Sequence, residues 1–503
     1  MKKRSALVLV ICLTCGWPVA GCAVRQPARV SASVTAADSR ALLRLDLERI
    51  FADTNFAAAQ WGVEIVSLDR GEILYEINPG RLYMPASNNK VLTAVSALLR
   101  LGPEFRYQTR VATDGEIGDG LLRGNLVIVG SGDPSNAARF LEKDPFRMFK
   151  DWASRLAQMG VRAIEGNIIG DDGAFEETIL GSGWEWDDLA YGYAAPVSAL
   201  QFNENLATIE IYPAAVVGEN ATVKQFPVED YFAIDAEIAT GEAGSDSRID
   251  VERGEGRESL VLRGTVPLRK EAFRQTVAVR APSEYYLRAL RQTLAAQGID
   301  VSHAPVKTTR AADNKSLNVL WSHSSPTLAE ILKPLLKVSQ NLYAETLART
   351  LGLVERGEGS FAKGREVVEE VLRGMAIESG TYAYADGSGL SRHNLVSADL
   401  MVRILRYMYR HRFFPQFYES LPIAGVDGTI SGRMRGTRAE NNVHAKTGSI
   451  AYVRALSGYV RTADGEMLAF SMIANNFLVS SRAAEYVQDA ALERLANFSR
   501  EKR

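Results

Sequence analysis

Residues 84–93 read MPASNNKVLT, and this stretch decides how the rest of the chain is interpreted. Ser87 and Lys90 are three positions apart, and the residues after them have the apolar spacing of a helix, so both side chains are expected on one face of a helix's first turn. A serine hydroxyl becomes a nucleophile when a base removes its proton, and a lysine kept neutral by burial or nearby cations is such a base. Alone, the spacing is more typical of an N-cap serine followed by a solvated lysine.

A second hydroxyl lies far along the chain, in the stretch LLKVSQNLYAETL. Ser339 and Asn341 occupy positions i and i+2 at the junction of two expected helices. In a bend, the hydroxyl and the amide can both point into one cleft. The alternative is a helix-capping serine beside a solvated asparagine.

A lysine and a hydroxyl also follow an expected strand near the C-terminus. Lys446, Thr447 and Gly448 stand at its end and are followed by Ser449. A cation, a hydroxyl and a residue without a Cβ form a cradle for a carboxylate, because the glycine lets a substrate backbone lie close to the strand. The alternative is a strand that runs into a turn and carries a surface lysine.

The order of the three motifs is more specific than any one of them. Ser-x-x-Lys, Ser-x-Asn and Lys-Thr-Gly form the signature of penicillin-binding proteins and class A β-lactamases. Here 339 − 87 = 252 residues separate the first two serines, whereas a β-lactamase places them much closer together. A long insertion at this place makes the chain resemble the low-molecular-mass penicillin-binding proteins typified by penicillin-binding protein 4, the D-alanyl-D-alanine carboxypeptidase/endopeptidases of peptidase family S13. Further stretches carry the resemblance, which spans residues 38–498: GNLVIVGSGDPS, GWEWDDLAYGYAAPVSAL, YADGSGLSRHNLVS and VHAKTGSI.

The resemblance implies an α/β (α+β) serine β-lactamase/transpeptidase-like fold, with an antiparallel sheet flanked by helices. The residue pattern agrees, because helical and strand-like material at both chain ends encloses a β-richer middle. The three strands expected near the C-terminus leave an open edge that an N-terminal hairpin can pair with. We therefore predict a discontinuous catalytic domain with an insertion: 36–104 and 310–503 for the domain, and 105–309 for the insertion. The insertion is expected to form two small domains, 105–180 with 270–309, and 181–269.

The resemblance also implies acyl transfer without a cofactor or a metal ion. Ser87 would attack the carbonyl of a D-alanyl bond, Lys90 would act as the base, and water would hydrolyse the acyl-enzyme. Ser339 would pass a proton to the leaving nitrogen, and Asn341 would hold Lys90 and a substrate amide. The implied substrates are the D-Ala-D-Ala ends and cross-links of peptidoglycan, and β-lactam antibiotics would be covalent inhibitors.

Substrate binding is implied for further residues. Lys446 and Thr447 would bind the terminal carboxylate, and the backbone N–H groups of Ser87 and Ser449 would form an oxyanion hole. Asp188 and Tyr193 resemble family positions that bind the free amino end of the peptide. A turn carboxylate is the alternative for Asp188, and the neighbouring Asp187 is an equal candidate one residue out of register.

One departure and one further likeness concern positions near these motifs. Gln340 stands where aspartate is common in the family, but the implied chemistry does not use that side chain. Asp386 resembles a family position at the rim of the cleft, and a structural turn explains this aspartate nearly as well.

The N-terminus predicts export. Residues 1–22 combine a basic start, an apolar core and small residues, as in a signal peptide. Residues 19–22, VAGC, resemble the lipobox of bacterial lipoproteins, in which Cys22 would be lipidated; cleavage after Ala23 without lipidation is the alternative. The expected location is the periplasm, with a lipid anchor in a bacterial membrane, the outer membrane being favoured. No disulfide is expected, since all cysteines lie in this segment.

Other functions fit less well. The chain has 58 basic and 60 acidic residues, which gives no sign of a nucleic-acid partner. The sequence contains no Gly-x-Ser-x-Gly or His-Glu-x-x-His motif, and its histidines lack the spacing of metal ligands. Two alternatives remain, a murein-binding lipoprotein that kept the fold without catalysis and a β-lactamase. Covalent labelling by penicillin would exclude the first, and rapid penicillin turnover would indicate the second.

Overall fold

The structure, a computed structural model, describes residues 36–254, 258–269, 271–310 and 317–500. The two ends of the described chain meet in one five-stranded sheet, the main sheet, with the strand order β17-β18-β19-β1-β2. Its strands are β1 (Gln60–Ser67), β2 (Ile73–Ile77), β17 (His444–Ile450), β18 (Val453–Arg461) and β19 (Met467–Asn475). Strand β1 pairs antiparallel with β19 from Gln60 opposite Asn475 to Ser67 opposite Leu468. The predicted pairing of the N-terminal hairpin with the C-terminal strands is confirmed.

Helices cover both faces of the main sheet. On one face lie α1 (Ala36–Phe51) and α10 (Ser481–Ala496). On the other lie α2 (Lys90–Leu101), α5 (Leu328–Lys337), α6 (Asn341–Arg356), α7 (Phe361–Gly374), α8 (Ala398–Tyr409) and α9 (Phe414–Ser420). Every residue of β19 is buried, as expected for a central strand that is covered on both sides.

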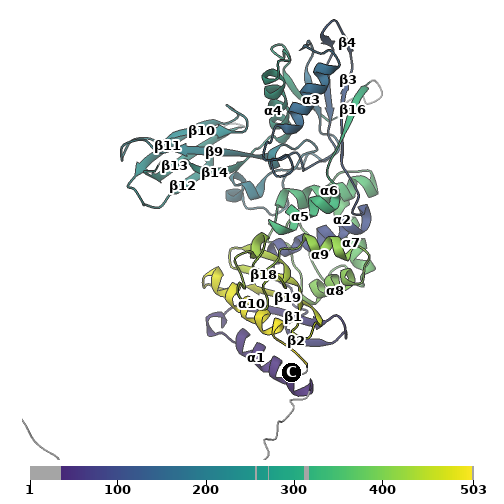
Figure 1. Ribbon diagram of the computed structural model, residues 1–503, viewed down its shortest axis with the longest axis vertical. Coiled ribbons are helices and arrows are strands. Elements are labelled where there is room, and N and C mark those ends of the chain that lie inside the picture. The colour runs from purple at the N-terminus through teal and green to yellow at the C-terminus, as the bar shows by residue number, and fades with distance from the viewer. Residues whose placement is uncertain (1–35, 255–257, 270, 311–316, 501–503) are drawn as a thin grey trace, which may run out of the picture.

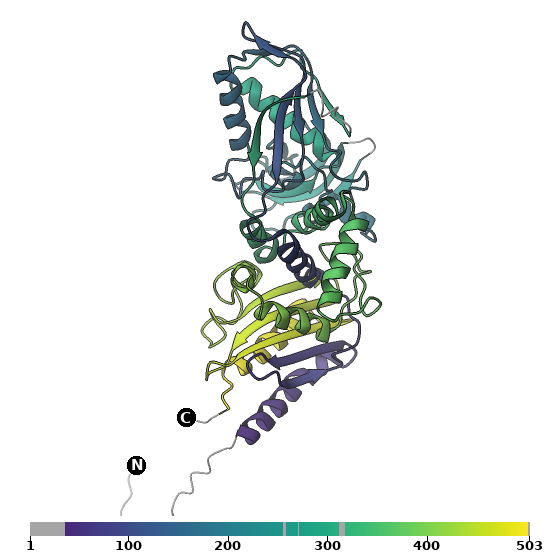
Figure 2. The ribbon, with the colours of Figure 1, turned by 90° about the vertical axis from the view of Figure 1, so that its right-hand side faces the viewer.

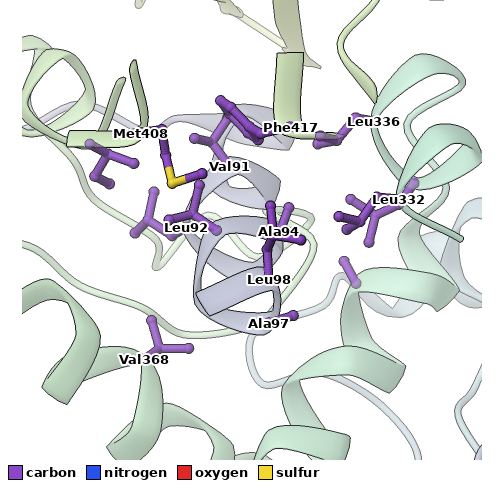
Figure 3. Packing of buried hydrophobic residues seen from close by; sticks show 14 of the residues in the cluster. Val91, Leu92, Ala94, Ala97, Leu98, Leu332, Leu336, Val368, Met408 and Phe417 are labelled. Carbon is purple, nitrogen blue, oxygen red and sulfur yellow. The ribbon is translucent and has the colours of Figure 1, made fainter. Parts of the chain in front are cut away.

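Helix α2 is the centre of the second helical layer. Its side chains are buried from Lys90 to Leu98, so the helix is enclosed on all sides. Figure 3 shows it surrounded by Leu332 of α5, Val368 of α7, Met408 of α8 and Phe417 of α9. Burial of each such side chain stabilises the fold by about 1.5–3 kcal/mol. This packing fixes the position of Lys90, the first residue of the helix.

The chain between α2 and α5 builds a separate part of the molecule, at the top of Figures 1 and 2. A second five-stranded sheet has the order β15-β8-β6-β3-β16, and α3 (Arg147–Gln158) and α4 (Pro282–Ala296) pack with it in one core. Its strands are β3 (Gln108–Thr113), β6 (Leu126–Val129), β8 (Ile168–Asp171), β15 (Val306–Thr309) and β16 (Asn318–Ser324). A small sheet beside it contains β4 (Glu116–Gly118), β5 (Leu121–Arg123) and β7 (Ala163–Ile164).

Two three-stranded sheets extend sideways from this part, to the left in Figure 1. One has the order β10-β9-β14, with β9 (Leu206–Tyr212), β10 (Thr222–Phe226) and β14 (Phe273–Ala278). The other has the order β11-β13-β12, with β11 (Ala233–Gly241), β12 (Arg248–Arg253) and β13 (Ser259–Pro267).

Two strand pairings lie outside the predicted segment borders. Strand β16 pairs with β3, so the chain leaves the second sheet after Ser324 rather than at residue 310. Strand β14 pairs with β9, although it begins after residue 269. Both strands belong to sheets whose other members lie far away in the sequence, and such long-range pairing is not visible in local residue patterns.

The predicted export signal, including Cys22, lies outside the described residues. Within the described ranges, no helix has both the length and the apolar character needed to cross a membrane.

Candidate active site

Ser87 and Lys90 are in direct contact at the start of α2. Ser87 lies in a single 3-10 turn, η2 (Ala86–Asn89), and Lys90 begins the α-helix that follows. The Lys90 Nζ donates to the Ser87 Oγ at 2.8 Å. The two residues were expected in the first turn of one helix; a tighter turn precedes that helix, because Ala86 has a φ of +47°, which an α-helix does not allow.

Two further oxygens hold the Lys90 amine in place. It donates to the Asn341 Oδ1 at 2.5 Å and to the backbone carbonyl of Ser388 at 2.7 Å. Together with Ser87, these acceptors take up all three N–H groups of the amine. The amine is therefore fixed in one orientation, with one N–H directed at the candidate nucleophile.

Burial changes the acidity of this amine. The Lys90 side chain is inaccessible to solvent. Burial lowers the pKa of Lys90 to about 7, and the carboxylates of Asp386 and Glu345 limit the shift. Because this pKa lies near neutrality, a large share of the lysine is neutral at physiological pH and can accept a proton.

The second pair of functional groups lies opposite, where α6 meets β17. The Lys446 Nζ donates to the Ser339 Oγ at 2.8 Å and to the Thr447 carbonyl oxygen at 2.8 Å. Ser339 lies in the bend before α6 with a φ of +62°, an uncommon backbone conformation for a residue with a side chain. The bend predicted for the Ser-x-Asn motif is present and directs Ser339 toward Lys446.

Lys446 is as deeply buried as Lys90. Burial, and after it the positive charge of Lys90, lower the pKa of Lys446 well below its usual range. Repulsion between two cations is mutual, so the protonated form of either lysine disfavours that of the other. A bound anion beside Lys446 would reverse the shift.

Strand β17 approaches the turn of Ser87 so closely that a side chain at Gly448 does not fit. A Cβ at this position would come within 2.2 Å of the Pro85 carbonyl oxygen. The sequence suggested that the glycine lets a substrate approach, and the structure adds that it lets β17 pack against η2. The glycine thereby brings Thr447 and Ser449 beside Ser87.

The motif residues line one cavity of about 480 Å³. Its walls include residues from all three motifs: Ser87, Ser339, Asn341, Thr447 and Ser449. A second wall comes from the insertion, which contributes Asp188 and Tyr193. The cleft is large enough for a short peptide.

Asp188 and Tyr193 contact each other at this wall. The Tyr193 hydroxyl donates to the Asp188 Oδ1 at 2.6 Å, and the Tyr193 carbonyl oxygen accepts from the Asn341 Nδ2 at 2.7 Å. Asp188 lines the cavity, whereas Asp187 does not. One carboxylate oxygen each of Glu185, Asp187 and Asp188 lies within 4.8 Å of the others, so this end of the cleft is acidic.

Two residues that support the site were not recognised in the sequence, the buried Glu345 and the exposed Thr429. Glu345 accepts from the Ser388 N–H at 2.8 Å and lies 3.5 Å from Arg349, so it holds the segment whose carbonyl binds Lys90. Thr429 contacts the Thr447 hydroxyl at 2.7 Å. Glu345 lies one helical turn after Asn341, and this spacing could have indicated it; no local signal distinguishes Thr429.

Asp386 is not at the rim of the cleft, the family position that it resembled. It is inaccessible to solvent, and its carboxylate accepts from the backbone N–H groups of Gly389 and Ser391 at 2.6 and 2.7 Å. It also accepts from the Trp184 Nε1 at 2.9 Å. The structural turn is the correct interpretation, because a carboxylate is the side chain that can accept so many donors at once.

The fold and these contacts define a serine enzyme of the acyl-transfer type, with the three motifs of the penicillin-recognising proteins around one cleft. The chain belongs to the D-Ala-D-Ala carboxypeptidase 3 (S13) family, whose family model matches residues 43–498. The predicted family and fold class are confirmed.

Individual relatives are similar over nearly the whole chain. A D-alanyl-D-alanine carboxypeptidase of Actinomadura sp. (strain R39) is 35% identical over 468 residues, which cover 91% of this chain and 85% of the relative. The crystal structure of penicillin-binding protein 4 from Haemophilus influenzae superimposes with a TM-score of 0.77 at 28% identity, over 89% of this chain and 97% of that one. A complex of the same Haemophilus protein with a β-lactam gives a TM-score of 0.72 at 27% identity, over the same shares of the two chains.

Proposed function

We propose that Ser87 is the nucleophile of a D-alanyl-D-alanine carboxypeptidase and that Lys90 is its base. The observation that carries this proposal is the 2.8 Å contact between the Lys90 Nζ and the Ser87 Oγ, made by an amine whose pKa is lowered to about 7. In its neutral form Lys90 accepts the Ser87 proton as the oxygen attacks the peptide carbonyl. The bond from Ser87 to the carbonyl carbon forms, the bond to D-alanine breaks, and water then hydrolyses the ester.

The leaving nitrogen needs a proton, and the pair Ser339 and Lys446 is placed to supply it. The Ser339 hydroxyl accepts from Lys446 on one side and can donate to the leaving amine on the other. Asn341 keeps Lys90 in position through its Oδ1. Its amide nitrogen is bound to the Tyr193 carbonyl oxygen and becomes available to a substrate amide if this contact opens.

The terminal carboxylate of the substrate binds between Lys446 and Thr447, with the Thr429 hydroxyl beside it. A carboxylate here supplies the anion that a buried cation lacks, so binding returns Lys446 to its charged form. The backbone N–H groups of Ser87 and Ser449 hold the developing oxyanion. Each such donor contributes about 3 kcal/mol in other acyl-transfer enzymes.

Asp188 and Tyr193 form the subsite for the free amino end of the peptide side chain. An ammonium group would be attracted by Asp188 and by the two acidic residues beside it. We expect Asp188→Asn to raise KM for a peptide with a free amino group by about tenfold and to leave KM for its N-acetylated form unchanged. Asp187→Asn is the matched control, and an equal effect of both variants would contradict the assignment.

Covalent labelling tests the nucleophile directly. The wild-type protein and a Ser154→Ala control, whose serine is exposed on α3, should form a stable adduct with fluorescent penicillin. Ser87→Ala should form none and should release no D-alanine from a D-Ala-D-Ala peptide. A labelled Ser87→Ala protein would overturn the proposal. Rapid penicillin turnover by the wild type would favour a β-lactamase.

The substrate in the cell wall is the stem peptide of peptidoglycan, both as a free D-Ala-D-Ala end and as a cross-link between two chains. Asp188 and Tyr193 of the insertion line the cleft, and the longer cross-linked peptide would lie along them. Digestion of purified muropeptides with a mass-spectrometric readout should show loss of D-alanine from monomers and cleavage of dimers. Monomer trimming alone would remove the endopeptidase part of the proposal.

The protein acts outside the cytoplasmic membrane and is anchored there through a lipid on Cys22, as the signal-like sequence 1–22 suggests. Membrane fractions of cells fed labelled palmitate should contain the labelled protein, and Cys22→Ser should abolish the label. Normal secretion of an unlabelled wild-type protein would indicate an ordinary signal peptide.

A further inference from the structure

A second cavity lies at the other end of the main sheet from the catalytic cleft. Strand β17, which carries Lys446, forms one edge of the sheet, and β2 forms the opposite edge. The cavity, of about 690 Å³, is lined by residues of β1, β2 and α8. These elements lie in the lower half of Figure 1. It shares no residue with the catalytic cleft.

A buried carboxyl group at this cavity has no hydrogen-bond partner. Glu64 of β1 points to the α8 side of the sheet and is only 6% exposed. Its Oε2 is fully buried and has no hydrogen-bond partner in the described chain. Burial, and after it the nearby Asp399 and Glu76, raise the pKa of Glu64 to about 7, against the opposing charges of Arg403 and Arg406. A buried carboxyl without a donor is costly, so this group would gain from a ligand that supplies one.

The facing helix presents a row of arginines to the same cavity. Arg403, Arg406 and Arg410 of the α8 segment are spaced so that they follow one face of the helix. Arg403 is engaged with Asp399 at 2.9 Å. Within the described residues, Arg406 and Arg410 take part in no ion pair and no side-chain hydrogen bond. Two unpaired guanidinium groups beside a cavity form a suitable site for a carboxylate.

We propose that this cavity binds a short peptide with a free amino end and a free carboxyl end. The ammonium donates to Glu64, and the carboxylate accepts from Arg406 and Arg410. An anion alone would leave the buried Glu64 carboxyl without a donor, and a cation alone would leave the two arginines, which are exposed to solvent, without a bound carboxylate. The volume accommodates a peptide of a few residues.

The choice of a peptide, rather than another zwitterion, rests on the proposed function, because fragments and ends of stem peptides carry both charges. An occupied second cavity would hold one peptide of the polymer while another lies in the catalytic cleft. Two linked binding sites raise the effective concentration of substrate at the catalytic cleft without any new contact there.

The experiment removes the catalytic cleft from the measurement. Protein acylated on Ser87 with benzylpenicillin is titrated with D-alanyl-D-alanine by calorimetry. If acylation fails, the double variant Ser87→Ala/Lys446→Met, which lacks the proposed carboxylate site of the catalytic cleft, takes its place. N-acetyl-D-alanyl-D-alanine lacks the ammonium, and D-alanyl-D-alaninamide lacks the carboxylate. We expect D-alanyl-D-alanine to bind at one site. The dissociation constant of each analogue should be higher by about tenfold or more.

Variants of the lining residues test whether D-alanyl-D-alanine binds in this cavity. Glu64→Gln and Arg406→Gln should each weaken binding of D-alanyl-D-alanine by about tenfold, whereas Arg147→Gln on α3 should not change it. Each variant is also labelled with fluorescent penicillin; normal labelling shows that the protein is folded and that the catalytic cleft is intact.

Several results would overturn the proposal. Absence of binding at ligand concentrations about 100-fold above a millimolar dissociation constant, a value typical of weak ligands, would do so. Equal binding of the N-acetylated analogue or of inorganic phosphate would also do so, because it would indicate an anion site. Unchanged affinity in Glu64→Gln would also do so. Failure of Ser87 acylation refutes the proposed function instead, and titration of the Ser87→Ala/Lys446→Met protein then still tests the second cavity.

Discussion

Lowering the pH from 8 to 5 should slow the acylation of Ser87 by benzylpenicillin by about a hundredfold. The reason is the pKa of Lys90, which burial lowers to about 7. Only the neutral amine can take the Ser87 proton, so the acylation rate should follow the neutral fraction of Lys90. That fraction is about nine-tenths at pH 8, one-half at pH 7 and one-hundredth at pH 5.

The size of the effect comes from the buried position of Lys90. With the ordinary lysine pKa of about 10.4, about one amine in 2,500 would be neutral at pH 7. Burial of the Lys90 amine therefore increases the amount of active base by about three powers of ten at neutral pH. Hydrolysis of the acyl-enzyme does not enter the measurement, since the acylation step alone is followed.

Stopped-flow acylation with a fluorescent penicillin between pH 5 and 9 gives the midpoint. Glu345→Gln keeps the hydrogen-bond acceptor for Ser388 but removes a charge that raises the pKa of Lys90, so its midpoint should lie at lower pH than that of the wild type. Glu355→Gln, on the same helix and paired with Arg100 at its surface, is the matched control. A flat profile, or a midpoint near pH 10, would refute Lys90 as the base.

Three further outcomes are expected. Gly448→Ala should lower the melting temperature and weaken penicillin labelling. The new Cβ would lie 2.2 Å from the Pro85 carbonyl oxygen and force β17 away, at a cost of about 1–3 kcal/mol. Unchanged thermal unfolding would contradict this. Lys446→Met should reduce kcat/KM for a D-Ala-D-Ala peptide far more than for its C-terminal amide, and equal losses would remove the carboxylate assignment. Trp184→Phe should destabilise the protein by about 1 kcal/mol in urea unfolding, through loss of the hydrogen bond to Asp386.

The positions of the three motifs could be predicted from the sequence because each has a local signal. Apolar spacing placed Lys90 on a helix, and the alternation after residue 443 placed Lys446 on a strand. The local geometry could not be predicted. The left-handed backbone of Ala86 and Ser339 arises from tertiary packing around the cleft, and neither residue type favours it.

Contacts between residues that lie far apart in the chain also could not be predicted from the sequence. Thr429 meets Thr447 because the loop containing η6 (Gly428–Ile430) lies against β17, and no periodicity records that contact. The pairing of β16 with β3 is of the same kind, since the two strands are separated by most of the insertion. The resemblance to the family indicated that the insertion exists but not where its strands return.

The insertion is joined to the catalytic centre through hydrogen bonds to α6, in addition to lining the cleft. At the start of α6, Asn341 bonds to Lys90 on one side and to the Tyr193 carbonyl on the other. One turn further, Thr346 accepts from Gln201 of the insertion at 2.9 Å, and Arg349 donates to the Thr178 carbonyl oxygen at 2.9 Å.

These contacts run along the same helix that carries Glu345, the residue that supports the Ser388 segment beneath Lys90. A peptide that moves Tyr193 would therefore act on the hydrogen bonds of the base through Asn341. If the proposed roles hold, α6 connects substrate recognition by the insertion with activation of Ser87, because Asn341 of the Ser-x-Asn motif bonds to both Lys90 and the Tyr193 carbonyl oxygen.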